Sequence, residues 1–375
     1  MQDGYFNYYT RLAESWWERR DFMRGWRRLH ASDRRWVPPY YPTLTRALTP
    51  GSTPHVDRQR PVLFWVEALP GKPNTEGNWN AQRFNSAFME EAVATAVLLA
   101  DPRRRDGTAT LAFFSVANDE ESLERLWAVA QEQAFGRGFY NLVGPVAFSP
   151  YLGYGVLLDH FNQTPPLYTP YNPPYLPEIL DTLLERVQTA RLYHLDVPAK
   201  VNVPSAPAHL RPLTANDEST VLPTLFAALD SPFGSPPPDA TEASFMVDWW
   251  RIAPSSGWIA EVEDQPVGFV LLQPDLAPAL RRAGGGRNLL WRLWWQWRRT
   301  RPARAGRIVA GGVLPNWRQQ GIGSQLLSAA LRSAQLQGWH KLTIGPVADD
   351  SQAATFLLAH HAQPLQHYAL YGMES

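Results

Sequence analysis

Cysteine is absent from this 375-residue chain, and several kinds of chemistry are excluded with it. Disulfide bonds, thiolate metal sites and cysteine nucleophiles all require that side chain. The sequence also has no apolar run near the roughly 20 residues that span a bilayer. The first residues carry neither a basic nor an apolar targeting segment, so we expect a cytoplasmic chain. Motifs of the types Gly-x-Ser-x-Gly, His-Glu-x-x-His and Gly-x-x-x-x-Gly-Lys-Ser/Thr are missing as well.

Acidic residues are missing from one long stretch, although the net charge of the chain is zero. Between Leu276 and Ala348 there is no Asp or Glu, whereas arginine is frequent. The preceding stretch, Ala206 to Asp275, has the opposite bias, with ten acidic side chains. A basic block of this kind suits an anionic ligand or an anionic membrane surface. We do not expect nucleic acid as a partner, because the arginines are not interleaved with stacking positions along several elements.

Aromatic residues are abundant: 16 Trp, 14 Tyr and 16 Phe. The apolar content of 45% is ample for a core, and the length predicts two domains. Three prolines between Val197 and His209 indicate a linker, which divides the chain into residues 1–205 and 206–375.

Strands and helices are expected to alternate in the first half, as in an α/β lobe. The opening helix has a tryptophan face that packs on the protein body or contacts a membrane. The expected strands are 62–66, 108–116, 140–146, 155–161 and 191–195, and the expected helices are 78–100, one beginning at Asn118, and 178–190.

One stretch of the second half, Ile308 to Ser324, predicts a strand, a turn at Pro315 and glycines that open a helix. The unpaired N–H groups at such a helix start, together with the helix dipole, favour a phosphate group. Glycines that merely cap a turn are the alternative. The order of elements around the Arg-x-x-Gly-x-Gly sequence, with a second strand at Lys341–Ile344, resembles the acyl-CoA-binding motif of the GNAT superfamily of N-acyltransferases.

The resemblance extends over nearly the whole chain and is greatest to a bacterial group with two such lobes in tandem. Features of that group appear in order at Trp36–Pro39, Asn118–Asp119, Gly144–Pro145, Gly155–Phe161, Tyr171–Tyr175 and Arg318–Gly323. It implies an α/β (α+β) fold of two GNAT-like lobes, each a mixed, mainly antiparallel central sheet flanked by helices. The first lobe is degenerate, because it has no Arg-x-x-Gly-x-Gly equivalent.

The resemblance also implies a set of site residues. Acetyl-CoA or another acyl-CoA would be held by Val313, Leu314, Arg318, Gln319, Gln320, Gly321, Ile322, Gly323 and Ser324. The N–H of Val313 would polarise the thioester carbonyl. The amine would lie between the lobes, near Tyr171 and Asn172. No metal is expected, and His360–His361 is interpreted as a surface pair.

Catalysis requires a base for the amine, and Asp349 and Asp350 follow the strand that would border the thioester. N-capping of the next helix is their alternative role, above all for Asp350. Many GNAT enzymes carry a tyrosine in that helix as general acid, but here Phe356, Leu357 and Leu358 occupy it. Tyr371, Tyr368 or water would have to replace it.

The insertion at residues 276–307 is basic and rich in tryptophan. A helix in it would bury most of its circumference in protein or in lipid, and Trp with Arg favours a membrane interface. Three hypotheses follow: an acyl-CoA-dependent N-acyltransferase, most simply an acetyltransferase acting on a primary amine; a long-chain acyl or lipid-amine N-acyltransferase peripheral on the inner face of an anionic membrane; or a non-catalytic CoA-binding protein. The sequence does not predict the oligomeric state.

Overall fold

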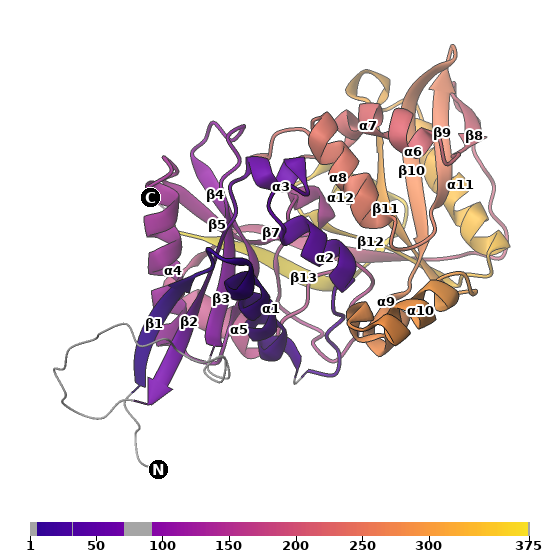
Figure 1. Cartoon of the computed structure of the whole chain (residues 1–375). Coiled ribbons are helices and arrows are strands. Elements are labelled where there is room, and N and C mark those ends of the chain that lie inside the picture. The colour runs from indigo at the N-terminus through magenta and orange to yellow at the C-terminus, as the bar shows by residue number, and fades with distance from the viewer. Residues whose placement is uncertain (1–5, 32, 71–91, 374–375) are drawn as a thin grey trace.

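The computed structural model describes residues 6–31, 33–70 and 92–373, and all structural statements concern these residues. Figure 1 shows two lobes side by side, joined by long strands that cross between them. Among the described helices, none combines the length and the apolar character needed to cross a membrane.

The N-terminal lobe contains seven strands with helices on both sides. Its strands are β1 (Phe6–Leu12), β2 (Val62–Pro70), β3 (Ala92–Leu99), β4 (Thr108–Val116), β5 (Asn141–Val146), β6 (Val156–Leu157) and β7 (Glu185–Asp196). Its α-helices are α1 (Trp16–Ala31), α2 (Tyr41–Leu48), α3 (Pro54–Arg58), α4 (Glu120–Phe135) and α5 (Tyr175–Leu183).

The C-terminal lobe repeats this plan. Its strands are β8 (His209–Pro212), β9 (Ser256–Val262), β10 (Gln265–Pro274), β11 (Ala305–Val313), β12 (Lys341–Ala348) and β13 (Gln363–Gly372). Its α-helices are α6 (Asp217–Thr220), α7 (Leu222–Leu225), α8 (Ala240–Trp250), α9 (Ala277–Arg282), α10 (Leu289–Arg298), α11 (Ile322–Leu336) and α12 (Gln352–Ala359).

The strands of both lobes form one sheet, in the order β1-β2-β3-β4-β5-β13-β7-β12-β11-β10-β9-β8, with β6 paired to β13. The two lobes therefore exchange strands. The last strand of the chain, β13, lies between β5 and β7 of the N-terminal lobe, and β7 in turn pairs with β12 of the C-terminal lobe. In Figure 1 the yellow strand β13 can be followed into the N-terminal half of the molecule.

Each lobe has one parallel pair in an otherwise antiparallel sheet, β4 with β5 and β11 with β12. The second strand of each pair contains Gly-Pro-Val, at residues 144–146 and 345–347. A helix, α4 or α11, connects the two strands of each pair. The mixed, mainly antiparallel sheet flanked by helices that the sequence predicts is confirmed.

The helices bury distinct sets of residues against the two faces of the sheet. One apolar cluster joins α1 and α2 to α7 and α8 across the lobes and includes Phe22, Trp26, Phe226 and Trp250. A second surrounds α4 in the N-terminal lobe, and a third packs α11 and α12 against the C-terminal sheet. The shared cluster shows that the lobes bury apolar side chains against each other as well as sharing strands.

Three predicted elements are wrong in part. The described end of the helix predicted at 78–100 is strand β3, since its Ala-rich sequence pairs with β2 on one side and β4 on the other; residues 78–91 lie outside the described residues. The helix predicted at 178–190 ends at Leu183, and residues 185–196 all belong to β7. The strand predicted at 155–161 is limited to Val156–Leu157. In each case long-range strand pairing decides the structure over local preference.

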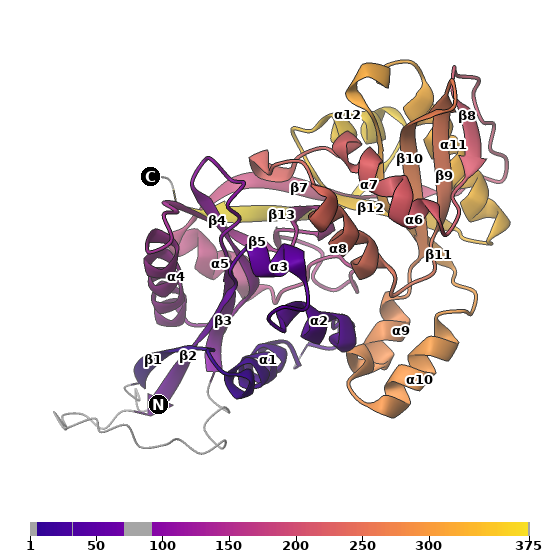
Figure 2. The ribbon, with the colours of Figure 1, turned by 45° about the horizontal axis from the view of Figure 1, so that its top comes forward.

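The basic insertion forms two helices, α9 and α10, at the periphery of the molecule. Both views show them projecting from the C-terminal lobe (Figures 1 and 2). The insertion is anchored at its start by the partly buried carboxylate of Asp275, which accepts hydrogen bonds from the N–H groups of Leu167 (3.0 Å) and Ala277 (3.1 Å). Burial raises the pKa of this carboxylate. The anchor fixes the first residues of the insertion to both lobes.

Candidate functional site

The strands β11 and β12 separate along their length. They pair in parallel only from Ala305–Lys341 to Ile308–Ile344, yet β11 continues to Val313 and β12 to Ala348. Near this point β11 has an extra residue relative to β10, because Leu271 pairs with Ala310 and Leu272 with Ile308. The result is a gap between two central strands.

Beyond Ile308, the edge of β11 that faces this gap has no strand partner in the described chain. The N–H of Leu314 donates to the carbonyl of Val267 on β10 (2.8 Å). Because backbone groups alternate in direction along an antiparallel pair, Val313 and Gly311 direct theirs away from β10. Gly311 is accordingly exposed, although β11 lies inside the sheet. This edge can accept an extended, amide-containing group as a further strand.

The turn after β11 connects the end of that strand to helix α11. A short 3-10 helix at Pro315–Trp317 is followed by Gln319 and Gly321, both with positive φ (61° and 83°). The first helical bond of α11 runs from the Gln325 N–H to the Gly321 carbonyl (3.0 Å). The amides of Ile322, Gly323 and Ser324 precede it and have no partner in the described chain. Such a helix start binds anions through its free N–H groups and its dipole.

Arg318 is held within the protein. Its guanidinium donates to the carbonyls of Val313 (2.9 Å) and Ala228 (3.1 Å) and to the side chain of Gln352 (2.8 Å). Asp230 lies 3.5 Å away. Arg318 therefore ties the end of β11 to the loop after α7 and to the start of α12. It shapes the turn and adds positive charge beside the free amides.

His360 is a neighbour of the turn that sequence analysis missed. Its Nδ1 lies 2.9 Å from the Phe356 carbonyl, so that nitrogen carries the proton, and its Nε2 accepts from the Ser324 hydroxyl (2.8 Å). The ring packs on Phe356, 4.2 Å between centroids. No pattern could reveal the contact, because the two residues are 36 positions apart on different helices. His360 is thus a partner of the glycine turn, whereas a surface pair was predicted.

Asp349 and Asp350 have different surroundings at the end of β12. Asp349 is partly buried, and its carboxylate lies 3.3 Å from Nε of Arg191 on β7. Asp350 is exposed, and its carboxylate accepts a long hydrogen bond from Gln188 (3.4 Å). The suggested N-capping role is wrong, because Ser351 caps α12 by accepting from the Ala354 N–H (3.1 Å).

Two buried tyrosines lie close enough to Asp349 for its charge to influence them. Burial raises the pKa of Tyr154, and the negative charges of Asp350 and Asp349 raise it further. Burial and Asp349 likewise raise the pKa of Tyr193, which pairs with Ile344 where β11 and β12 separate. Both phenols keep their protons at neutral pH. Neither was identified from the sequence, because strand exchange brings them to this place.

Tyr371 and Tyr368 lie elsewhere. The Tyr371 hydroxyl donates to Asp181 (3.0 Å) and accepts from Arg186 (3.1 Å), both in the N-terminal lobe. Tyr368 is fully buried and donates to the side chain of Gln366 (3.1 Å). Because β13 crosses into the N-terminal lobe, the Tyr371 phenol contacts residues of that lobe, whereas Tyr368 lies in electrostatic range of Arg307 on β11.

Tyr171 and Asn172 are buried and hold their own lobe together. The Tyr171 hydroxyl donates to Asp33 (2.5 Å), and the Asn172 amide bonds both backbone groups of Leu157. They nevertheless line a cavity of about 220 Å³ between the lobes. Its wall is mostly apolar and includes several aromatic side chains, and both lobes contribute to it: Trp26, Trp36, Tyr40, Phe113, Phe114, Tyr154, Tyr168, Trp249, Ile252 and Leu280.

Arg307 connects this cavity to the separating strands. It is buried on β11 and donates to Thr169, a cavity residue (2.6 Å), and to the carbonyl of Gly345 on β12. Burial lowers its pKa to about 10, and Asp275 partly offsets that effect. Arg307 remains charged at neutral pH and fixes the cavity wall to the gap.

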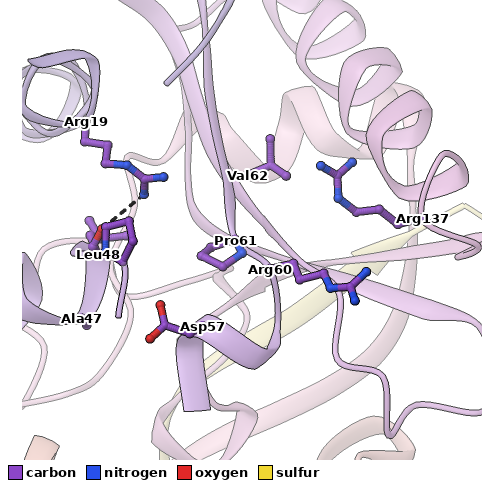
Figure 3. A pocket seen from close by; sticks show the side chains of 9 residues that line it. Arg19, Ala47, Leu48, Asp57, Arg60, Pro61, Val62 and Arg137 are labelled. Atoms are coloured by element: carbon purple, nitrogen blue, oxygen red, sulfur yellow. Dashed lines mark hydrogen bonds between the residues drawn. The ribbon is translucent and has the colours of Figure 1, made fainter. Parts of the chain in front are cut away.

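In the described part of the N-terminal lobe, helix α4 offers no equivalent anion site. Helix α4, in the position of α11, begins with Asp119, which accepts from the Ser122 N–H (3.1 Å), followed by Glu120 and Glu121. These carboxylates occupy the positive end of the helix dipole and repel an anion. A second hollow, of about 340 Å³, lies on this lobe among Arg19, Asp57, Arg60 and Arg137 (Figure 3). It shares no residue with the gap or the turn. Within the described residues, no group of three His, Asp or Glu could hold a metal.

Comparisons with known proteins agree with this geometry. Residues 222–361 match the model of the acetyltransferase (GNAT) family. Among solved structures, a tandem GNAT protein from the clavulanic acid biosynthesis pathway is 13% identical, with a TM-score of 0.54 over 99% of this chain and 98% of that one. A conserved protein of Enterococcus faecalis, described as a probable N-acyltransferase, is 7% identical, with a TM-score of 0.55 over 98% and 72%. An N-acetyltransferase of the GCN5-related type from Anabaena variabilis is 8% identical, with a TM-score of 0.52 over 97% and 72%.

At these sequence identities the solved structures show the fold alone. The family model shows that the C-terminal lobe is similar to GNAT acetyltransferases. No curated protein matches the sequence. The family consists of acyl-transfer enzymes, and the open edge of β11 with the free amides of α11 lies inside the matched region. The C-terminal lobe therefore matches the acetyltransferase (GNAT) family over residues 222–361, and the whole chain has the fold of two GNAT-like lobes in tandem.

Proposed function

We propose that this protein is an acyl-CoA-dependent N-acyltransferase that transfers an acyl group, most simply acetyl, directly from CoA to a primary amine. The observation that carries the proposal is the open edge of β11 followed at once by the unpaired amides of α11. The first suits the amide groups of pantetheine and the second suits pyrophosphate.

Binding of the donor would use backbone groups for the most part. Gly311 and Val313 would pair with pantetheine, and Leu314 would begin the turn. The N–H groups of Gln319, Gln320, Gly321, Ile322, Gly323 and Ser324 would surround the pyrophosphate, with Arg318 behind them. The acid-free surroundings from Leu276 to Ala348 favour such an anion.

Chemistry would then need few side chains. The amine nitrogen attacks the thioester carbonyl, a C–N bond forms, the C–S bond breaks, and the amine proton passes to Asp349. The Val313 N–H stabilises the negative charge on the carbonyl oxygen. The departing thiolate takes a proton from water or from a phenol near Asp349, since Phe356 stands where many relatives have tyrosine. Alignment of the two substrates supplies much of the rate.

The acceptor would lie between the lobes, where the aromatic cavity and Arg307 adjoin the gap. An apolar wall of this composition favours an amine with an aromatic or aliphatic body. Tyr171 and Asn172 would contribute to that wall. We expect the protein to act in the cytoplasm, where acyl-CoA is made.

Two other functions have an observation in their favour. Tyr40 lines the cavity and also packs on Trp295 of the basic insertion, which favours a long acyl chain or a lipid amine reached from the inner membrane surface. The absence of a tyrosine from α12 favours a protein that binds CoA without catalysis. Acyl transfer to a panel of soluble and lipid amines separates all three.

Calorimetry with acetyl-CoA and longer acyl-CoAs tests the binding site. We expect one site per chain, because α4 has carboxylates where α11 has free amides. Gly321→Ala should weaken binding by roughly tenfold, because a Cβ at positive φ costs about 1–2 kcal/mol and moves the turn.

The matched control is Gly338→Ala, at the other end of α11. Gly338 also has positive φ (72°), and its Cβ would meet nothing within 4 Å, so its strain is similar. This variant should bind CoA as the unaltered chain does. Equal weakening by both variants, or no binding of any acyl-CoA at millimolar concentration, would contradict the assignment.

A further inference from the structure

Helix α10 directs an apolar face to solvent. Its one buried side chain is Trp295, which packs toward Tyr40 with 6.0 Å between ring centroids. At 100° per residue, the face opposite Trp295 contains Leu289, Leu293, Trp297 and Leu290. These side chains are 68%, 60%, 54% and 77% exposed. A helix on the surface of a soluble domain normally has polar residues on this face, so α10 has the reverse pattern.

Polar side chains border the apolar stripe. By the same geometry Arg292 and Gln296 lie along one side of it and Arg298 along the other. Arg282 and Arg301 lie over the rings of Trp294 (5.7 Å) and Trp297 (4.7 Å). Arginine heads beside tryptophan rings around a leucine stripe are typical of helices that lie in a membrane interface.

The positive charge around α10 is not compensated by carboxylates. In the described chain no ion pair joins an Asp or Glu to the arginines of the insertion, Arg281, Arg282, Arg287, Arg292, Arg298, Arg299, Arg301 and Arg304. The hydrogen bonds of Arg292 and Arg299 go to carbonyl groups. This surface, α10 with the arginines of the insertion, is called the α10 surface below.

We propose that the α10 surface docks on an anionic lipid bilayer, with α10 lying in the plane of the interface. The helix has ten residues, about 15 Å, so it can lie on a bilayer and not cross it. Leucine and tryptophan enter the headgroup boundary, and the arginines contact acidic headgroups. The peripheral position of α9 and α10 leaves this face accessible to a flat surface (Figure 2).

Charge argues for lipid over a second copy of the chain. In a two-fold dimer through this surface each patch would meet its own equivalent. The arginines of one copy would then face those of the other, without an acidic residue of the insertion between them. An anionic bilayer supplies both the apolar layer and the negative charge that the surface needs.

Vesicle flotation of the full chain tests the proposal. We expect at least about tenfold more protein on vesicles of phosphatidylcholine with phosphatidylglycerol than on phosphatidylcholine alone, with recovery falling as salt rises. Leu293→Ser/Trp297→Ser should lower the recovery by roughly tenfold. The matched control, Phe135→Ser/Leu336→Ser, removes two apolar side chains elsewhere that are even more exposed, and it should float like the unaltered chain.

A second pair of variants tests charge. Arg287→Gln/Arg301→Gln/Arg304→Gln should lose most binding to anionic vesicles, whereas Arg105→Gln/Arg125→Gln/Arg137→Gln, with the same loss of net charge on the N-terminal lobe, should retain it. Thermal unfolding checks that every variant is folded. Absence of the unaltered chain from anionic vesicles overturns the proposal. Equal losses of vesicle binding in the test and control variants would also overturn it. So would a chain that does not bind vesicles but forms a dimer that Leu293→Ser/Trp297→Ser dissociates.

Discussion

At the scale of the residue, Asp349 and Asp350 are neighbours with unequal prospects as a catalytic base. Asp349 is partly buried at the end of β12, beside Arg191 and in electrostatic range of Tyr154 and Tyr193. Asp350 is exposed and turned toward Gln188. The two residues are adjacent in sequence and have the same side chain, so each is a control for the other.

We expect Asp349→Asn to lower kcat by about 100-fold, because the amine then has no positioned base. The KM for acyl-CoA should stay within about twofold, since the proposed donor contacts lie on β11 and α11. Asp350→Asn should change neither constant by more than about twofold. Steady-state kinetics with an established amine measures both. Equal losses in the two variants would mean that the carboxylates act through the fold of this corner.

His30 makes a different residue-scale contribution, to stability. It is buried between Trp26 and Trp36, and its Nε2 lies 2.6 Å from the Ser115 hydroxyl. Burial lowers its pKa to about 4, and Asp33 partly offsets that effect. In the unfolded chain its pKa is about 6.5, so only the unfolded state takes up a proton between these values. The contribution of neutral His30 to the free energy of unfolding is therefore fully present above about pH 6.5, and it is lost as the pH falls toward about 4.

His30→Gln should remove this pH dependence while leaving a hydrogen-bonding group for Ser115. Between about pH 7 and about pH 4.5, the free energy of unfolding should fall by roughly 2.5 kcal/mol less in the variant than in the unaltered chain. Urea denaturation at a series of pH values measures the difference. The control is His340→Gln, whose side chain is exposed. Parallel pH profiles for the unaltered chain and His30→Gln would contradict the assignment.

At the scale of the element, local signals predict some structures and long-range pairing decides others. Strand β11, the glycine turn and α11 could be predicted, because proline, glycine and an apolar stripe follow one another within a few turns. The β9–β10 hairpin is also a local structure, and its turn at Glu263 and Asp264 has the positive φ values of a tight connection. The half of the candidate site that we propose to bind acyl-CoA includes β11, the glycine turn and α11.

Elements whose partners are distant could not be predicted. Residues 185–190 were expected to be helical, but they extend β7, which pairs with β12 on one edge and with β13 on the other. No local sequence pattern in residues 185–190 indicates that β12 and β13 are their strand partners. The same exchange puts Tyr371 in the N-terminal lobe and Tyr193 beside Ile344. The catalytic half of the site therefore depends on topology more than on motif.

At the scale of the whole molecule, the exchange of β7 and β13 makes the two lobes depend on each other. Without residues 206–375 the N-terminal lobe loses β13 from between β5 and β7, which leaves two open strand edges. Without residues 1–205 the C-terminal lobe loses β7, so β12 keeps only β11 as a neighbour. The side chains of Tyr368, Leu370 and Tyr371, at most 1% exposed in the whole chain, then lose their surroundings. The predicted boundary near residue 205 is a change of lobe along the sequence, and independent folding does not follow from it.

We therefore expect neither 1–205 nor 206–375, expressed alone, to unfold cooperatively, whereas the two expressed together should associate and bind acyl-CoA once per pair. Open strand edges and exposed apolar residues should make each fragment aggregate. Calorimetric unfolding and size-exclusion chromatography measure this. A protease site placed in the exposed segment 202–205 is the control, because cleavage after folding should leave the halves together with the acyl-CoA affinity of the intact chain. If 206–375 alone melted at the temperature of the whole chain, the exchanged strands would be additions to a self-sufficient domain, and the dependence inferred from the sheet order would be wrong.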